Sequence, residues 1–249
     1  MTTQDERIDF GFREVPRAQK ARLVRGVFDS VAPSYDAMND LMSLGLHRAW
    51  KSAFVAALAV SPREALLDLA SGTGDVAMLA RRRGAGRVVS SDVNEAMLRA
   101  GRARAAARGL RSGLEYVVAD AERLPFPDRR FDAVSIAFGL RNVTDRAAAL
   151  REARRVLRPG GRFLCLEFAP RPSVDALRGL YDAWSFRALP ALGAAVAGDA
   201  ESYRYLAESI RRFPDAEALA GMMRGAGLER VSHRALSGGI VAIHAGRRL

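Results

Sequence analysis

The sequence predicts an α/β protein built on a doubly wound, mainly parallel sheet. Between residues 65 and 168, apolar runs of strand length alternate with segments of helix length, and the connections between them are short. This alternation favours parallel strands covered by helices on both faces. Polar residues follow the ends of several apolar runs. Because ligands of such sheets bind beyond the carboxyl ends of the strands, these polar residues mark one shared candidate site.

The elements of this core follow from apolar runs and from their glycine and proline breaks. Strands are expected at residues 66–70, 87–91, 114–119, 132–138 and 162–168. Helices are expected at residues 76–83, 95–108 and 144–157, the last of them closed by Arg158-Pro-Gly-Gly161.

A chain of 249 residues is expected to form a single domain with room for a lid. The segments that we expect are a helical lid (17–58), a cofactor-binding core (62–170), a helical insert (171–213) and a closing region (214–249). In the closing region we expect a helix at 216–226 and strands at 228–236 and 239–245.

Composition excludes several functional classes. The net charge is +11, but the basic residues are almost all arginines spread among alanines, without the interleaved aromatics that stack on bases, so we expect no nucleic-acid partner. We find no apolar run long enough to span a membrane and no secretory signal. The only cysteine, Cys165, cannot form an internal disulfide, and no metal-binding spacing is present, so a cytoplasmic protein without a metal is expected.

The most informative segment is the apolar strand that ends in Ser71-Gly-Thr-Gly-Asp75. The residues Gly72, Thr73 and Gly74 allow backbone to approach a ligand closely, and the following helix begins with N–H groups that face it. Asp92 lies twenty residues after Gly72, at the end of the next strand, where a carboxylate can accept both hydroxyls of a ribose. The pattern predicts a nucleoside-containing cofactor.

Two cofactors fit the glycine pattern. Gly72-Thr-Gly-Asp-Val-Ala77 matches the dinucleotide fingerprint, so an oxidoreductase of the NAD type is one alternative. A carboxylate at Asp75 would repel a pyrophosphate, whereas the ammonium and sulfonium of S-adenosylmethionine (SAM) are compatible with Asp68 and Asp75. This charge argument favours SAM. Helix capping by Asp75 is the structural alternative.

Two further strand ends contribute candidate site residues. Asp120 can accept from an adenine amino group while the N–H of Ala121 donates to a ring nitrogen, although a turn aspartate is the simpler alternative. After the next strand, Arg141 and Asn142 could stabilise and orient an acceptor oxyanion. A surface arginine and a turn asparagine are the alternative there.

The predicted lid contains a mixture of polar and aromatic residues. Tyr35 and His47 lie in a region that otherwise has the pattern of amphipathic helices, and both side chains can handle a proton. Packing of the lid with satisfied hydrogen bonds explains them equally well.

Four segments carry patterns more specific than the glycine loop. Residues 35–50 contain Tyr-Asp-x-Met-Asn-x-Leu-Met-Ser-x-Gly-x-His-Arg-x-Trp, and residues 155–167 contain Arg-Val-Leu-Arg-Pro-Gly-Gly-x-x-x-x-Leu-Glu. Residues 138–145 are Phe-Gly-Leu-Arg-Asn-Val-Thr-Asp, and residues 199–210 contain Asp-Ala-x-Ser-Tyr-Arg-Tyr-Leu-x-Glu-Ser-Ile. From about residue 10 to its end, the chain resembles the ubiquinone/menaquinone-biosynthesis C-methyltransferase family.

The resemblance implies a class I methyltransferase fold, a seven-stranded sheet whose last strand is antiparallel, and SAM as the methyl donor. Transferred position by position, the cofactor contacts fall on Thr73, Asp92, Asp120 and Ala121. The chain departs from the family pattern at Ala137, where the family often has serine, so a hydroxyl contact with the cofactor is absent there. A milder departure is Ser71 in place of glycine.

The function that the resemblance implies is methylation of a ring carbon of a polyprenylated hydroquinone, either demethylmenaquinol or 2-polyprenyl-6-methoxy-1,4-benzoquinol, or both. In this hypothesis Arg141 and Asn142 hold the acceptor oxygen, and Tyr35 or His47 assists proton movement or closes the lid. A non-catalytic SAM-binding scaffold of a quinone-synthesis complex is the alternative outside catalysis.

The insolubility of such an acceptor suggests peripheral contact with the inner face of a membrane. The apolar segment 188–197 is a candidate surface for that contact or for pairing with a second copy of the chain.

Overall fold

The computed structural model describes residues 6–31, 39–40, 43–110, 112–197 and 199–249. The chain divides into two compact units. The first unit comprises Met1–Ala49, Phe168–Asp215 and Ala235–Val241, and the second comprises Trp50–Glu167, Ala216–Arg234 and Ala242–Leu249. Both units draw on segments far apart in the sequence. The single domain with its four consecutive segments stays a prediction.

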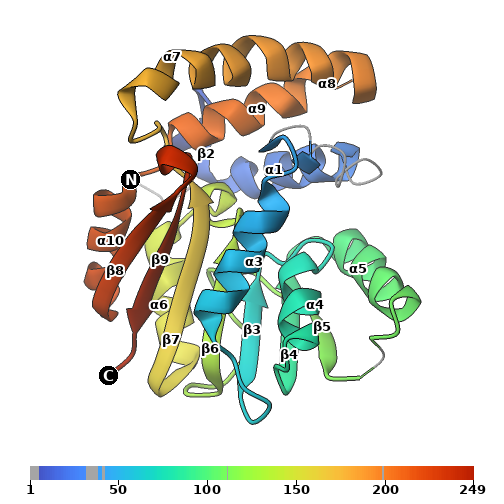
Figure 1. Ribbon diagram of the computed structural model, residues 1–249, viewed down its shortest axis with the longest axis vertical. Coiled ribbons are helices and arrows are strands. Elements are labelled where there is room, and N and C mark those ends of the chain that lie inside the picture. Colours follow the sequence, from blue (N-terminus) through green and yellow to red (C-terminus); the bar gives the residue numbers. More distant parts are fainter. Residues whose placement is uncertain (1–5, 32–38, 41–42, 111, 198) are drawn as a thin grey trace. The chain divides into compact units, whose positions relative to one another are not determined.

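A seven-stranded sheet with the order β5-β4-β3-β6-β7-β9-β8 forms the framework of the fold (Figure 1). Its strands are β3 (Ala65–Leu69), β4 (Arg87–Asp92), β5 (Leu114–Val118), β6 (Phe131–Ala137), β7 (Leu157–Phe168), β8 (Glu229–Leu236) and β9 (Val241–Arg247). The pairs from β5 to β7 are parallel. The predicted fold class is confirmed.

The last strand, β9, runs antiparallel to β7, as the family resemblance implied. Near the start of β7, the Gly160 N–H donates to the carbonyl of Arg248, just beyond the end of β9 (2.6 Å). Beyond the other end of β7, the Ala169 N–H donates to the carbonyl of Ile240, just before β9 begins (2.9 Å). The first contact pairs the start of β7 with the end of β9, and the second pairs the reverse ends.

Helices α4 (Asp75–Arg82), α5 (Glu95–Ala107), α6 (Arg146–Val156) and α10 (Ala216–Gly225) lie where the sequence predicts them. Side chains cap two of them, since Asn94 accepts from the Met97 N–H and Asp145 accepts from the Ala148 N–H. In the view of Figure 1, α3 (His47–Leu58) lies in front of the sheet and α6 behind it. The sheet is therefore covered on both faces.

The structure differs from the prediction at Arg158-Pro-Gly-Gly161, which lies within β7 and not in a turn before it. Leu157 pairs with Phe131, and the ladder resumes only where Arg162 pairs with Ala133. The strand therefore bulges by several residues, and Gly160 supplies the left-handed backbone (φ 80°) that the bulge needs. The buried Leu157 explains why pairing begins before the bulge.

The first unit contains an antiparallel hairpin that the sequence analysis missed. Strands β1 (Arg7–Phe10) and β2 (Arg13–Pro16) precede α1 (Arg17–Val31). The Phe10 ring stacks on Tyr205 with 4.2 Å between centroids. Each strand has only four residues, and Phe10 is the one buried residue among them, so the apolar alternation that would reveal the strands is too short.

The predicted helical insert is present as α7 (Asp175–Ala183), a π-helical turn (Trp184–Ala188), α8 (Leu189–Ala197) and α9 (Ala200–Arg211). Leu189 is buried, and a Cβ added at Gly193 would lie 2.4 Å from the Tyr203 ring. Close packing of α8 on α9 within the unit thus explains why part of the segment 188–197 is apolar. No helix among the described residues is long and apolar enough to cross a membrane.

Candidate functional site

The loop between β3 and α4 forms a tight turn at the carboxyl end of the sheet. Ala70, Gly72 and Gly74 have positive φ angles of 47°, 55° and 78°. The Ser71 N–H donates to the Ser91 carbonyl of β4 (3.0 Å), and the Gly74 N–H donates to the Ser71 carbonyl (2.9 Å). The loop leads directly into α4, whose first N–H groups have no partner within the helix.

Asp92 anchors this loop, a role that the sequence analysis did not foresee. Its Oδ2 accepts from the Gly72 N–H (2.8 Å), and its Oδ1 accepts from the Asn94 N–H (2.9 Å). Burial raises the pKa of the Asp92 carboxyl, although these backbone hydrogen bonds lower it in part. Because a carboxylate offers about four lone-pair sites, Asp92 can hold the loop and still accept a ribose hydroxyl.

Helix α5 packs directly on the glycine loop. A Cβ added at Gly101 would lie 2.9 Å from the carbonyl oxygen of Thr73. Arg104, one turn further along α5, donates from Nη1 to Thr73 Oγ1 (2.8 Å). The buried Thr73 is therefore fixed from the helix side, and its hydroxyl already accepts one hydrogen bond.

Asp75 is paired with two cations, which corrects one step of the sequence analysis. Lys51 Nζ donates to Asp75 Oδ2 (2.6 Å), and Arg104 Nη2 donates to Oδ1. Burial opposes ionisation of Asp75, but its pKa is lowered because Lys51 and Arg104 stabilise the carboxylate. Asp75 therefore presents no bare charge to a pyrophosphate, and the predicted repulsion is wrong, because Lys51 and Arg104 neutralise the carboxylate.

Asp68 lies buried at the carboxyl end of β3, below the loop. Ser135 Oγ donates to Asp68 Oδ1 (2.6 Å). Burial raises the pKa of Asp68 to about 7, outweighing the hydrogen bond from Ser135 and the attraction of Lys51. A cationic ligand group near this carboxyl would favour its ionised form.

The predicted adenine contacts lie on the turn after β5. Asp120 is exposed and its Oδ1 accepts from the Glu122 N–H (2.9 Å), while Ala121 is buried. The structure thus shows the turn-stabilising role that the sequence left open as the alternative. The adenine role of Asp120 and Ala121 stays a prediction.

Arg141 lies in the 3₁₀ turn after β6 and is only 5 % exposed, so the interpretation as a surface arginine is wrong. Its Nη1 donates to the Phe138 carbonyl (2.6 Å) and to Glu167 Oε1 (2.7 Å). Asn142, at the end of the same turn, is half-buried. Glu167 was not among the predicted site residues. Its position at the end of an apolar strand was the signal that could have found it.

The loop that carries Arg141 touches the glycine loop. A Cβ added at Gly139 would lie 2.5 Å from the Cβ of Ala70. Phe138, which precedes it, has a positive φ of 57°, and its ring lies 6.4 Å from Trp50 between centroids. The second unit therefore brings the predicted cofactor loop and the predicted acceptor loop together.

Of the two site residues predicted in the lid, the structure describes His47. His47 belongs to the first unit and is buried, and its Nε2 makes a 2.8 Å hydrogen bond with Asp40 Oδ1. Arg48 Nη2 donates to the other oxygen of Asp40 (2.6 Å), and both partners lower the Asp40 pKa, His47 through the larger effect. For the Nε2 side of the ring, this matches the hydrogen-bonded packing that the sequence left as the alternative. Tyr35 lies outside the described residues.

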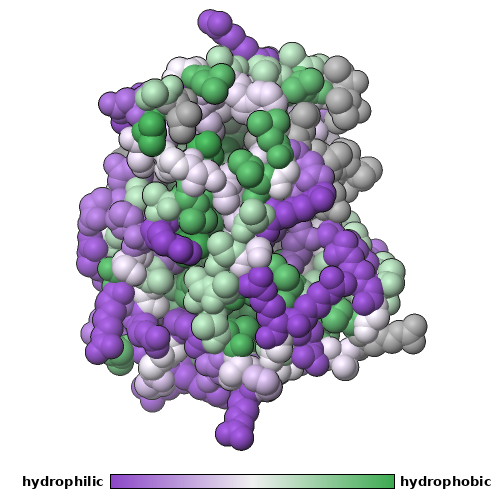
Figure 2. Space-filling view, in the orientation of Figure 1, coloured by the Kyte–Doolittle hydropathy of each residue, from purple (hydrophilic) through white to green (hydrophobic). Residues whose placement is uncertain are grey.

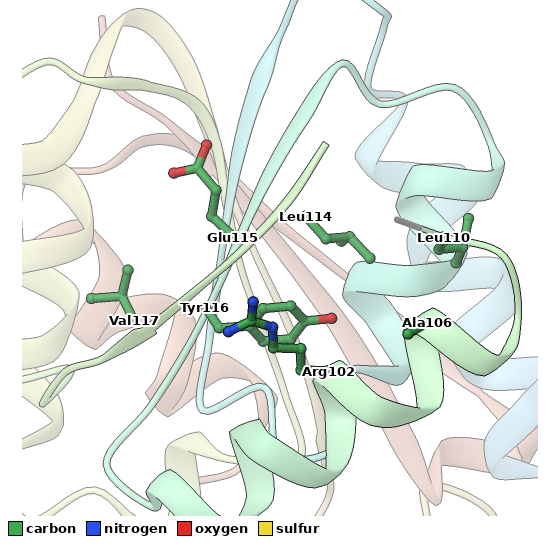
Figure 3. A pocket seen from close by; sticks show the side chains of 7 residues that line it. All are labelled: Arg102, Ala106, Leu110, Leu114, Glu115, Tyr116 and Val117. Carbon is green, nitrogen blue, oxygen red and sulfur yellow. The ribbon is translucent and has the colours of Figure 1, made fainter. Parts of the chain in front are cut away.

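A pocket of about 550 Å³ lies between α5 and the edge strand β5 (Figure 3). Figure 3 shows the Arg102 side chain beside the Tyr116 ring. No predicted cofactor or acceptor residue lines this pocket, whose other lining residues are Ala106, Leu110, Leu114, Glu115 and Val117. In the part of the chain that the structure describes, no group of three His, Cys, Asp or Glu residues could hold a metal ion.

Comparison with known proteins identifies similar chains. The model of the ubiE/COQ5 methyltransferase family matches residues 14–248. A protein of Acidiphilium cryptum named ubiquinone/menaquinone biosynthesis C-methyltransferase UbiE is 61% identical over 247 residues, which are 99% of this chain and 99% of that protein. The protein of the same name from Xanthomonas campestris pv. campestris is 54% identical, over 96% of this chain and 95% of its own length.

Solved structures share the fold. A SAM-dependent methyltransferase from Thermotoga maritima, described as a possible histamine N-methyltransferase, superposes with a TM-score of 0.64 at 19% identity. The match covers 91% of this chain and 100% of that one. A putative methyltransferase from Bacillus halodurans gives a TM-score of 0.57 at 22% identity, covering 79% of this chain and 99% of that one. At these identities the likeness concerns the fold alone.

Proposed function

The chain belongs to the ubiE/COQ5 methyltransferase family, and from that premise we propose its acceptor and the roles of its site residues. It is a SAM-dependent C-methyltransferase of ubiquinone/menaquinone biosynthesis. Family membership removes the dehydrogenase that the glycine pattern left open, and it assigns an enzyme in place of a non-catalytic scaffold. The proposed acceptor is the ring of a polyprenylated hydroquinone.

The residues of the glycine loop fit SAM. Gly72 and Gly74 have the positive φ that a close backbone approach requires, and Thr73 is fixed between them. Asp92 supplies the carboxylate for the ribose, and the predicted adenine contacts are Asp120 and Ala121. When bound, SAM supplies a sulfonium methyl group to an electron-rich ring carbon.

The acceptor loop provides the electrostatic part of the mechanism. Loss of a phenolic proton moves negative charge onto the acceptor oxygen and the ring carbon, so a fixed cation and an amide beside that oxygen favour the reaction. Arg141 and Asn142 take these roles. The observation that carries this assignment is the burial of Arg141 in a loop that touches the glycine loop through Gly139. In a buried setting, its hydrogen bonds are stronger than in water.

Tyr35 and His47 are proposed to assist proton movement or to close the lid. The pair of His47 with Asp40 supports the second role, since the hydrogen bond fixes the ring orientation. A pH-dependent loss of turnover in His47→Gln, with unchanged stability, would favour the first role.

Peripheral contact with the inner face of a membrane is part of the proposal, because the prenyl chain of the acceptor is insoluble in water. The first unit exposes the large apolar side chains Phe12, Leu44, Leu46, Val174 and Leu180. It carries equal numbers of acidic and basic residues, so the net charge of +11 resides in the second unit. On the face seen in Figure 2, hydrophobic and hydrophilic residues intermingle. A cytoplasmic location and pairing with a second copy complete the proposal.

The test is methyl transfer from labelled SAM under anaerobic conditions, with reduced demethylated benzoquinol and naphthoquinol offered in competition. Product from either ring supports the proposed acceptor, and the ratio tells which ring is preferred. SAM binding without product from either ring would overturn the acceptor assignment. The same assay with and without anionic vesicles tests the membrane contact. If the protein binds the membrane surface, long-chain acceptors should turn over faster on vesicles.

A further inference from the structure

Glu167 lies near the carboxyl end of β7 and is only 2 % exposed. Its Oε1 accepts from Arg141 Nη1 (2.7 Å), and its Oε2 lies 3.4 Å from the backbone nitrogen of Arg141, which donates to it. One carboxylate thus contacts both the side chain and the main chain of a single residue. Strands β6 and β7 are adjacent and parallel, with Ala137 opposite Leu166, so the two strand ends present Arg141 and Glu167 to each other.

Stability alone does not explain this pair. The two side chains are 5 % and 1 % exposed, and removing two charges from water carries a large desolvation penalty. Apolar residues of similar volume at such positions are often equally or more stabilising. What a buried ion pair provides in addition is a fixed geometry, because each partner holds the other in one orientation.

A further contact near the pair also restrains the Arg141 side chain. Arg141 Nη1 also donates to the carbonyl of Phe138, whose backbone has the unfavourable φ of 57°. Positive φ in a bulky residue costs free energy and persists where the surrounding structure enforces it. One guanidinium nitrogen therefore donates to Phe138 in the acceptor loop and to Glu167 in β7.

We propose that Glu167 is a positioning residue for methyl transfer: it holds the Arg141 guanidinium in the orientation that serves the acceptor oxygen. This inference rests on the role proposed above for Arg141. Glu167 acts through Arg141 and needs no contact with the acceptor. An arginine side chain has several rotatable bonds, and loss of its carboxylate partner would let it adopt orientations that no longer reach the oxygen.

The test is a double-mutant cycle on kcat, with Glu167→Gln, Arg141→Ala and the combination. Gln keeps the shape and the acceptor oxygen but removes the charge that strengthens the hydrogen bond. We expect Glu167→Gln to lower kcat about tenfold or more, with the Kd for SAM changed less than twofold. In the Arg141→Ala background, Glu167→Gln should cause no further loss, because the residue through which it acts is gone.

A matched control comes from a second Arg–Glu pair of the same unit. Arg162 donates to both carboxylate oxygens of Glu64 (2.8 and 2.9 Å), at the amino end of β3 and away from the loops. Glu64→Gln should lower the melting temperature and leave kcat unchanged. If Glu167→Gln does not fold, Glu167→Asp carries the same test, since it keeps the charge but withdraws it by one methylene.

A second readout is chemical rescue of Arg141→Ala by millimolar guanidinium chloride, compared with sodium chloride at the same ionic strength. Rescue should require about tenfold more guanidinium when Glu167 is also replaced by Gln. Multiplicative losses of kcat in the cycle, or normal kcat in Glu167→Gln, would overturn the inference even if guanidinium rescues. Full turnover in Arg141→Ala would instead overturn the role proposed for Arg141, so the two failures are distinguishable.

Discussion

Gly139 and Ala70 touch where the loops after two adjacent strands meet, and a Cβ on Gly139 would lie only 2.5 Å from the Cβ of Ala70. Ala70 belongs to the turn that leads into the glycine loop, and Gly139 directly precedes the turn that carries Arg141. A change in one loop is therefore transmitted to the other by direct contact.

This contact predicts that Gly139→Ala is destabilising. Forcing a methyl group into a close-packed contact costs about 1–3 kcal/mol, and the loops must separate to accommodate it. We expect weaker SAM binding together with lower turnover, measured by calorimetry and by the methyl-transfer assay. Adding Ala70→Gly should restore both, because it removes the opposing methyl group and relieves the positive φ at position 70.

A helical glycine with open space around it is the control. Nothing lies within 4 Å of a Cβ added at Gly221 in α10, so Gly221→Ala should raise stability by about 0.5–1 kcal/mol. Equal effects of the two glycine substitutions would contradict the importance of the Gly139–Ala70 contact.

Asp92→Ala should weaken SAM binding by roughly 1.5–3 kcal/mol, the typical range for hydrogen bonds to a charged group. The variant also frees the Gly72 and Asn94 N–H groups that Asp92 holds, so its melting temperature without ligand should fall. Asp92→Asn keeps one acceptor oxygen, so its affinity for SAM should lie between those of the wild type and of Asp92→Ala. A Kd for SAM equal to that of the wild type would refute the ribose contact.

Asp68 predicts a dependence of stability on pH. Its pKa is about 7 in the folded state, against the ordinary value of 3.8 for an aspartate, so the folded state binds more protons between these values. The free energy of unfolding contributed by this group is therefore highest below pH 3.8 and falls as pH rises toward 7, by an amount on the order of 4 kcal/mol.

Replacing Asp68 by Asn isolates this effect, because the amide does not titrate and its oxygen still accepts from Ser135. Urea unfolding of both proteins between pH 5 and 8 should show the variant gaining stability relative to the wild type as pH rises. A difference that stays constant over this range would mean that Asp68 does not titrate there.

The Lys51–Asp75 pair predicts a loss of stability in Lys51→Met. Both side chains are mostly buried (11% and 21% exposed), and removing one of the two cations leaves Asp75 poorly compensated. We expect a loss of about 1–3 kcal/mol in the free energy of unfolding. Lys51→Met combined with Asp75→Asn should recover most of it.

Arg48→Met is the surface counterpart, since Arg48 is 72% exposed where it pairs with Asp40. Exposed ion pairs contribute little, so its stability should change by less than about 1 kcal/mol. Comparable losses in the two methionine variants would indicate that burial of the Lys51–Asp75 pair has no energetic consequence.

The core of the fold was predictable because its signals are local. Each strand from β3 to β6 is a short apolar run bounded by glycine or polar residues. Its length and periodicity can therefore be recognised from consecutive residues alone. The glycine loop and the spacing to Asp92 likewise predicted the place of the cofactor site, because the carboxyl ends of parallel strands meet at one edge.

Electrostatic roles were not predictable in the same way. The sequence placed an isolated carboxylate at Asp75, but Lys51 lies 24 residues before it and Arg104 lies 29 residues after it. Only the packing of α3 and α5 against the loop brings the three charges together. The burial of Arg141 was unpredictable for the same reason, since its partner Glu167 lies 26 residues away in the sequence, on β7.

The sequence by itself therefore determined the order of the elements in the core, the family and the edge of the sheet that carries the site. The tertiary structure decided which charges are neutralised and which loops touch. It also decided that Asp92, predicted only to accept ribose hydroxyls, holds the glycine loop through the Gly72 N–H. The physical reason is that periodicity and turn chemistry act over a few consecutive residues. Desolvation and ion pairing depend on neighbours that folding brings together from distant parts of the chain.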